Sequence, residues 1–292
     1  MPIHDNSLSL RLCRADESGW GRNYFRPSQT IPECVLRRGR FSQKFMPNCL
    51  IINNAPKMGI PARIQSAGAN SSREAQEPSM RKRTATMQDL GLRPMEFRAL
   101  QRLNTPMKIQ NFLDTIPQNV EQGGQTCLAV REVLRQNRAH CIEGAMLAAC
   151  ALWIHGEPPL LLDLKAEQDF DHVVTLFRRG KYWGAISKTS TPLLRWRDPV
   201  YRSLRELAIT YLHEYANLRH QKTLRSYAGP LDLRRFDPSV WVTNTKNCWD
   251  VGYALEDLKH VALITRAQGR NLRLRDAIER KAGALKSDPR PT

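Results

Sequence analysis

The chain has 292 residues, 41% of them hydrophobic, and a formal net charge of +17, so it is long enough to bury a sizeable core. Its seven cysteines are an odd number and form no CxxC pair, which argues against a disulfide framework and against a standard zinc site. No stretch reaches the ~18 apolar residues of a membrane span, and the N-terminus lacks the apolar segment of a secretory signal. We therefore expect a cytoplasmic protein with reduced thiols, no membrane association and no metal or other cofactor.

Residues 1–86 show no sustained hydrophobic period and are rich in Pro, Ser, Asn and Arg, so we expect this segment to be mostly disordered. A start at Met80 or Met87 would remove most or all of it, and the sequence does not decide between these starts. The segment holds 14 basic and 6 acidic residues, and so carries about half of the excess positive charge. Because this charge belongs to no motif, we expect no nucleic-acid partner, and a basic nucleic-acid-binding protein is kept only as an alternative.

Apolar residues at helical spacing begin at Met87 and predict a helical N-terminal part. Pro94 and Pro106 suit the first turns of two helices, and Thr126 suits the N-cap of a third. Residues 141–154, CIEGAMLAACALWI, are apolar or small on nearly every side, which predicts a buried helix. The glycine and prolines of the following GEPP should end that helix.

Three short strands are predicted next, at 160–164, 171–177 and 182–187, and they form an antiparallel meander. The following segment, DPVYRSLRELAITYLHEYANL, has helical spacing with Pro199 in its first turn, so we expect one long helix there. The remainder of the domain should consist of loops and at least one more helix.

Together these elements predict an α+β domain over 87–275, followed by a charged tail over 276–292 that we expect to fray. In this domain a cysteine-bearing helix packs on a small antiparallel sheet. Cys141 opens the helix, where unpaired N–H groups and the helix dipole favour the thiolate that a nucleophile requires. His172, on the second strand, can be the base of such a nucleophile if the strand lies across the helix N-terminus.

Hairpin geometry indicates a third group that could orient this base. If the six residues KAEQDF form the first loop, Asp163 is paired with His172. If the four residues RRGK form the second loop, His172 is paired with Ser187 on its other side. Directly paired residues point to the same face of a sheet, so the three side chains would form a row, which a slip of one residue would break.

The stretch AHCIEGAMLAACALWIHGEPPLLL resembles the nucleophile segment of the transglutaminase-like superfamily, in which a cysteine opens a small-residue helix that leads into a strand. DHVVTLFRRGKYWGAIS resembles that family's histidine strand, its turn and its tryptophan-led next strand. The resemblance covers about residues 125–190, and the flanking segments resemble a group of bacterial proteins with this core. It implies a papain-like fold with Cys141 as nucleophile and His172 as general base. Two positions depart from the family pattern, since Ala139 stands where the family has Gly and Ser187 where it has Asp.

The resemblance implies acyl transfer on the amide bonds of a protein or peptide, of the peptidase, amidase or transglutaminase type. Because Ser187 carries no charge, we expect Asp163 to stabilise the protonated form of His172 instead. The backbone N–H of Cys141 is the expected oxyanion donor, with Gln125 as a further candidate. The departure at Ser187 favours an alternative, a catalytically inactive transglutaminase-like module that binds proteins or peptides. The acyl acceptor and the oligomeric state stay open.

Other interpretations of the same residues are possible. Cys141 can be a plain buried thiol, His172 a satisfied core histidine, and Asp163 a strand-end residue turned to solvent. His140 can be a second base or a metal ligand, although its spacing from other candidate ligands matches no recognisable zinc pattern. Cys127 can be a resolving thiol for Cys141.

Overall fold

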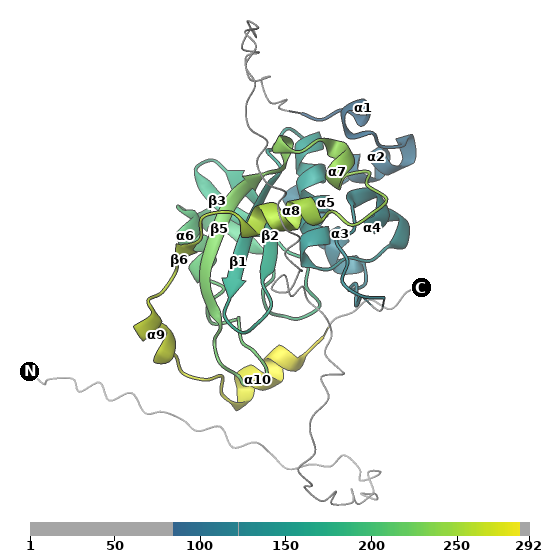
Figure 1. Ribbon diagram of the computed structural model, residues 1–292. Helices are drawn as coiled ribbons and strands as arrows, with labels where there is room; N and C mark the ends of the chain where they lie inside the picture. The colour runs from purple at the N-terminus through teal and green to yellow at the C-terminus, as the bar shows by residue number, and fades with distance from the viewer. Residues whose placement is uncertain (1–83, 122, 287–292) are drawn as a thin grey trace, which may run out of the picture. The chain divides into compact units, whose positions relative to one another are not determined.

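A computed structural model of the protein describes residues 84–121 and 123–286 (Figure 1). Within these residues the chain forms helices and one antiparallel sheet, so the predicted α+β class is confirmed. None of the helices described is both long enough and apolar enough to cross a membrane. The expectation of disorder for residues 1–86 falls almost entirely outside the described residues.

Five helices precede the sheet and form the predicted helical N-terminal part. They are α1 (Met87–Leu90), α2 (Pro94–Gln101), α3 (Pro106–Thr115), α4 (Val130–Gln136) and α5 (Cys141–Ile154). Pro94 and Pro106 each occupy the first turn of a helix, as predicted, where the N–H that proline lacks would have no intrahelical acceptor. The predicted N-cap at Thr126 is wrong, because Ala129 precedes α4 and the Thr126 hydroxyl donates to Glu143 instead.

The helix α5 has the bounds that its composition predicts, and all fourteen of its residues are buried. It packs on the sheet through β2 (His172–Arg179) and on the other side against α2, α3 and α4 (Figure 1). This position between two layers explains why the helix has no polar face. Gly156 follows the C-cap with φ of +85°, a left-handed conformation that a residue with a side chain rarely adopts.

Six antiparallel strands form the sheet in the order β4-β3-β2-β1-β5-β6. The predicted meander of three strands is confirmed as its centre. The remaining strands are β1 (Leu160–Ala166), β3 (Tyr182–Ile186), β4 (Arg197–Tyr201), β5 (Leu224–Asp232) and β6 (Val261–Ala262).

Both faces of the sheet are apolar. Leu161 and Val173 belong to the cluster of buried residues that includes α5. Leu164 and Val174 belong to a second cluster on the opposite face, which α6 (Leu204–Ile209) and the turn after it cover. The alternation of side chains along β1 and β2 therefore decides which residues can approach the N-terminus of α5.

The predicted long helix after residue 198 is wrong. Residues 197–201 form β4, and a shorter helix, α6, begins after the N-cap Ser203. Pro199 is tolerated in β4 because this is an edge strand that pairs only with β3. Val200, which would lie on the buried face of a helix with the predicted spacing, is 59% exposed. The prediction assigned residues 198–201 to the start of the helix, whereas these residues alternate as a strand does.

The strand β5 lies in the part of the chain that was predicted to consist of loops and at least one more helix, and it contains a Gly229-Pro230 dipeptide of the kind typical of turns. The structure accommodates Pro230 where the register between β1 and β5 shifts, between Leu161 and Asp163 of β1. A ladder irregularity is one of the places where a strand tolerates proline.

The chain after β5 holds several short helices and the predicted further helix. They are the 3-10 helix η2 (Leu233–Arg235), α7 (Pro238–Trp241), α8 (Trp249–Glu256), α9 (Arg266–Arg270) and α10 (Ala277–Ala284). The segment expected to be a fraying tail thus begins with a helix, which Asp276 caps through two backbone N–H groups. No side chain of α10 is buried, and residues 287–292 lie outside the described residues.

Candidate active site

Cys141 is the first residue of α5, and 2% of its surface is exposed. The free N–H groups and dipole of a helix N-terminus favour a negative charge at this position, whereas burial disfavours it. The groups around the thiol therefore decide its chemistry. The nearest in sequence is His140, the N-cap residue, which is fully buried.

Glu143 is a fully buried carboxylate that closes the N-terminus of α5. Its Oε2 accepts a hydrogen bond from the backbone N of His140 at 2.9 Å. Its Oε1 accepts from the Thr126 hydroxyl at 2.8 Å and from the backbone N of Leu128 at 2.9 Å, and Asn119 Nδ2 donates to both oxygens. Burial raises the pKa of Glu143, but His140 and the other donors outweigh it and bring the pKa down to about 2. The carboxylate is therefore ionised.

The His140 ring has oxygen atoms around its Nε2. Thr126 O lies 2.8 Å from Nε2, and carboxylate oxygens of Glu143 and Glu121 lie 3.2 and 3.6 Å away. A backbone carbonyl and an ionised carboxylate only accept hydrogen bonds, so Nε2 carries a proton. Burial lowers the pKa of His140, but hydrogen bonds and charge interactions with Cys141 and Glu143 raise it well above its usual value.

His172 is the first residue of β2, and 4% of its surface is exposed. Its Nε2 lies 2.8 Å from Ser187 Oγ, which itself donates a short hydrogen bond to Leu194 O. Because the hydroxyl has one proton and gives it to Leu194, it accepts a hydrogen bond from His172. In a neutral His172 ring the proton is therefore on Nε2, and Nδ1 keeps a lone pair. The predicted proximity of His172 and Ser187 is confirmed.

Ser187 is held in position by Gln110 of α3. Gln110 Oε1 accepts from the backbone N of Ser187 at 2.9 Å, and Gln110 Nε2 donates to Ser187 O at 2.9 Å. The same Nε2 donates to Asp114 Oδ1, which fixes the orientation of the amide. The glutamine thus holds both backbone groups of Ser187, as a neighbouring strand would, and so places its hydroxyl for His172.

The loop between β2 and β3 is shorter than predicted. Arg179 pairs with Tyr182 across a two-residue turn in which Gly180 has φ of +58°. This moves the register by two residues from the predicted one. Because side chains alternate with a period of two, the shift keeps Ser187 on the same face as His172, and a diagonal hydrogen bond replaces the predicted direct pairing.

The predicted pairing of Asp163 with His172 is wrong. Leu164 is the residue paired with His172, so the register differs by one residue and Asp163 points to the opposite face. In the same hairpin, the Asp171 carboxylate accepts a hydrogen bond from the backbone N of Ala166 at 2.9 Å. A side chain therefore closes this loop where the prediction assumed backbone pairing.

Asp163 forms a hydrogen bond with His260 instead, at 3.2 Å between Oδ2 and Nε2, and this bond raises the pKa of His260. Lys165, two residues further along β1, lies 2.5 Å from Asp171 Oδ2 and 4.0 Å from Glu256 Oε1. Burial raises the pKa values of both of these carboxyl groups. The hydrogen-bond partner of Asp163 is therefore His260, not His172.

A cavity of about 270 Å³ is lined by His172, Gln118 and Lys188, among other residues. Gln118 forms a β-bridge with the residue two positions before Cys141, and Lys188 packs so closely on Gly144 of α5 that a Cβ there would lie 2.5 Å from it. His172 and the N-terminus of α5 are therefore at the same end of the sheet, but His172 is paired with Leu164, so its side chain starts from the face that α6 covers and not from the face that α5 covers. Cys141 is not among the described residues that line this cavity.

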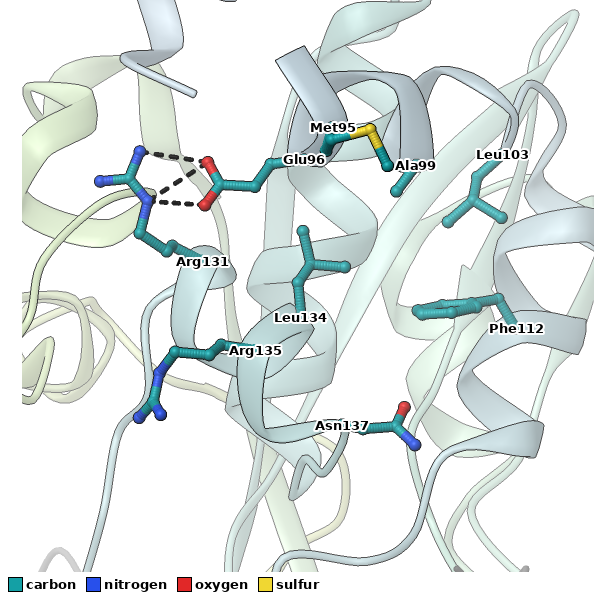
Figure 2. Close-up of a pocket in the computed structure, with 9 residues that line it drawn as sticks. All are labelled: Met95, Glu96, Ala99, Leu103, Phe112, Arg131, Leu134, Arg135 and Asn137. Atoms are coloured by element: carbon teal, nitrogen blue, oxygen red, sulfur yellow. Dashed lines mark hydrogen bonds and ion pairs between the residues drawn. The ribbon is translucent and has the colours of Figure 1, made fainter. Parts of the chain in front are cut away.

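A larger cavity, of about 440 Å³, lies among α2, α3 and α4. Figure 2 shows its apolar side chains, which include Leu103, Phe112 and Leu134, with the ion pair of Glu96 and Arg131 at one edge. None of the three predicted catalytic residues lines it, so it is separate from the candidate active site.

The other described cysteines lack the features of a reactive thiol. Burial raises the pKa of Cys150 and Cys127 far above the usual range and that of Cys248 to about 12. The Cys127 thiol also donates to the backbone O of Cys248, which disfavours the role of a resolving thiol. Within residues 84–121 and 123–286, no three His, Cys, Asp or Glu side chains are arranged to hold a metal ion. The suggested oxyanion role of Gln125 stays a prediction.

The chain matches no protein-family model and no curated protein sequence. The structure by itself shows a mixed α+β protein with a buried cysteine at the N-terminus of its central helix. The resemblance to the transglutaminase-like superfamily depends on the two sequence stretches around Cys141 and His172 alone.

Proposed function

We propose that the protein is a cysteine-dependent acyl-transfer enzyme that acts on amide bonds of a protein or peptide. Cys141 is the nucleophile and His172 is the general base. The thiol gives its proton to His172, and its sulfur attacks the amide carbonyl while backbone N–H groups at the start of α5 stabilise the oxyanion. His172 then protonates the leaving amine, and water or a second amine releases the thioester.

The observation that carries this proposal is the hydrogen bond between His172 and Ser187. It fixes Nε2 as the protonated nitrogen and leaves the Nδ1 lone pair to accept a proton. A base whose second nitrogen is oriented by a third group is the arrangement that an activated nucleophile requires. His172 also lines a cavity at the end of the sheet where α5 begins. Because its side chain starts from the face opposite α5, the proposal requires the imidazole to reach Cys141 around this end of the sheet.

Ser187, not Asp163, is the positioning residue in this proposal. Asp163 points to the opposite face of the sheet from His172 and is bonded to His260. A serine orients the imidazole but supplies no charge to stabilise its protonated form, so we expect slower turnover than with a carboxylate there.

A second candidate is a catalytically inactive module that binds a protein or peptide. The low exposure of Cys141 favours it, because a substrate carbonyl must reach the sulfur. The two candidates differ in whether Cys141 becomes acylated.

The test uses the full-length chain with casein as acyl donor and dansylcadaverine as amine acceptor. New peptide N-termini report hydrolysis, and fluorescent casein reports transamidation. We expect turnover that Cys141→Ser abolishes and that His172→Asn lowers by about 100-fold or more. Cys150→Ser and His155→Asn, on the same helix away from its N-terminus, are the matched controls and should leave turnover unchanged.

Turnover that persists in Cys141→Ser would contradict the proposal, as would a wild-type protein that neither cleaves nor labels casein. In the second case, binding of casein without turnover would support the inactive module.

A further inference from the structure

The cavity that His172 lines has one wall formed by the C-terminal part of the domain. Arg275, Gly283 and Lys286 line it together with His172. Figure 1 shows α10, the helix in this wall, beyond the end of the sheet at which β1 ends. The wall contributes two cations to the cavity, and the catalytic roles proposed above use neither of them.

Arg275 is held in position by contacts on two sides. Its backbone N donates to His220 O at 3.0 Å, and its guanidinium Nη2 donates to Glu214 O. On the other side the guanidinium packs against α10 at Gly283, where a Cβ would lie 2.9 Å from Nη1. The missing side chain of Gly283 therefore gives the guanidinium its room. Because these contacts fix Arg275 before a ligand arrives, less conformational freedom is lost on binding.

The charge of Arg275 has no ion-pair partner within the part of the chain that the structure describes. No carboxylate oxygen there lies within 4.0 Å of the guanidinium, and Glu214 O is the one acceptor that its N–H groups have in these residues. Glu279 and Asp169 act on it only from further away, and burial outweighs them and lowers the pKa of Arg275. A half-buried guanidinium with unused donors favours an anion that supplies both a charge and acceptors.

The carboxylates that line the same cavity are already bonded to other groups. Asp171 lies 2.5 Å from Lys165, and Glu214 lies 2.6 Å from Arg197. The third carboxylate, Asp169, accepts hydrogen bonds from a threonine hydroxyl and from a backbone N–H. The lysine and the arginine of the two ion pairs do not line the cavity. The lining therefore leaves the charge of the Arg275 guanidinium available for a ligand.

The size and charge of the cavity limit the class of ligand. Its volume of about 270 Å³ is just below the ~300–1,000 Å³ of sites for drug-sized molecules, so it fits a side chain or a chain end and not a folded partner. A guanidinium binds carboxylates and phosphates through paired N–H groups. The three carboxylates in the lining would repel a doubly charged phosphate more strongly than a singly charged carboxylate, so they favour the carboxylate.

We propose that Arg275 binds a carboxylate group of the ligand, so that the peptides recognised at the His172 cavity are acidic ones. The carboxylate belongs either to an aspartate or glutamate side chain or to the C-terminus of the peptide, because both present the same pair of oxygens. The proposal rests on the proposed function in that the ligand is a peptide, and the inactive binding module would use the same cavity. Arg275 determines specificity and takes no part in making or breaking bonds.

The test measures the binding of short rhodamine-labelled peptides to the full-length protein by fluorescence anisotropy. The peptides share one design, in which the central residue is glutamate or glutamine and the C-terminus is a free acid or an amide. The flanking positions are randomised among uncharged residues, so the result does not depend on a particular sequence. We expect a peptide with a carboxylate to bind about tenfold more tightly than the peptide without one, and the peptide that does so identifies the source of the carboxylate.

Arg275→Gln should remove this preference and leave the binding of the uncharged peptide unchanged. Arg273→Gln is the matched control, because Arg273 is 77% exposed, pairs with Asp276 and does not line the cavity. It removes the same charge two residues away and should keep the preference.

A second variant keeps the test decisive if Arg275→Gln fails to fold. Gly283→Ala retains the charge and suits a helix better than glycine does, but its Cβ would lie 2.9 Å from Nη1 of Arg275. The guanidinium must then move, and we expect the acidic peptide to bind about threefold more weakly.

The inference is overturned if acidic and uncharged peptides bind the wild type equally, or if Arg273→Gln lowers the preference as much as Arg275→Gln does. Inorganic phosphate that displaces the acidic peptide better than acetate does at equal concentration would also contradict it. The casein assay separates this result from the proposed function. A preference that depends on Arg275, in a protein without turnover, supports the inference and contradicts the enzyme, and turnover without the preference does the reverse.

Discussion

His140 and His172 are both almost completely buried, yet their surroundings differ in charge. The Nε2 of His140 lies among a backbone carbonyl and two carboxylates, whereas that of His172 faces one neutral hydroxyl. The first environment stabilises an imidazolium, and the second fixes the tautomer of a neutral ring. Two histidines of equal burial can therefore differ in the form of the ring that their surroundings favour, because their partners differ.

The largest effect should come from removing the carboxylate that supports the cation. Glu143→Ala leaves His140 and several buried donors without their acceptor, and we expect the free energy of unfolding to fall by about 3–5 kcal/mol. Urea denaturation at pH 6 measures it. Glu206→Ala, at the third position of α6 but exposed, is the matched control and should cost about 0.5 kcal/mol. Equal losses in the two variants would mean that Glu143 is no more than a helix cap.

The pH dependence of stability should separate the contribution of Glu143 from that of His140. Glu143 has its pKa lowered from 4.5 to about 2 by folding, so its contribution, about 3 kcal/mol, is present above pH 4.5 and is lost as the pH falls toward 2. The pKa of His140 is raised above 6.5, so its contribution is present below pH 6.5 and is lost as the pH rises through the folded value. Stability should therefore be greatest between about pH 4.5 and 6.5.

Urea unfolding from pH 3 to pH 9 checks this profile. His140→Asn should remove the decline on the alkaline side, whereas His172→Asn should leave it in place. An alkaline decline that survives in His140→Asn would show that another group causes it.

The smallest effect should come from the neutral partner of His172. Ser187→Ala removes the hydroxyl between His172 Nε2 and Leu194 O, and we expect a loss of about 1–2 kcal/mol. Nitrogen chemical shifts should show His172 with its proton on Nε2 in the wild type and a mixture of tautomers in the variant. Thr175→Val, which removes a buried hydroxyl bonded to Ala145 O, should cost a similar amount without changing the tautomer. An unchanged tautomer in Ser187→Ala would leave Ser187 without a positioning role.

Part of the candidate site could be predicted from sequence because it depends on local patterns. The run of small and apolar residues predicts α5 to the residue, and with it the place of Cys141 at a helix N-terminus. The meeting of His172 and Ser187 is also predicted, although the loop between their strands is two residues shorter than assumed. The wrong loop length did not affect this prediction, because an even shift in register keeps a side chain on the same face of the sheet.

The roles of Asp163 and His140 could not be predicted in the same way. Asp163 is displaced from His172 by a single residue of register, in a hairpin whose loop contains a hydrogen bond from the backbone N of Ala166 to the Asp171 carboxylate. The surroundings of His140 depend on Glu121, Thr126 and Glu143, and only Glu143 has a sequence signal, since it stands three residues after the N-cap. The capping-box pattern S/T-x-x-E does not match this position, because the N-cap residue is His140.

The sequence by itself determined the elements whose cause is local: the buried helix α5, the three central strands, and the prolines that open α2 and α3. The tertiary structure alone decided the edge strand β4, the strand β5 through Gly229-Pro230, and the partners of each buried charge. The physical reason is that periodicity and capping act within a few residues. Strand register and the compensation of a buried charge depend instead on groups brought together from distant parts of the chain, such as Asp163 and His260.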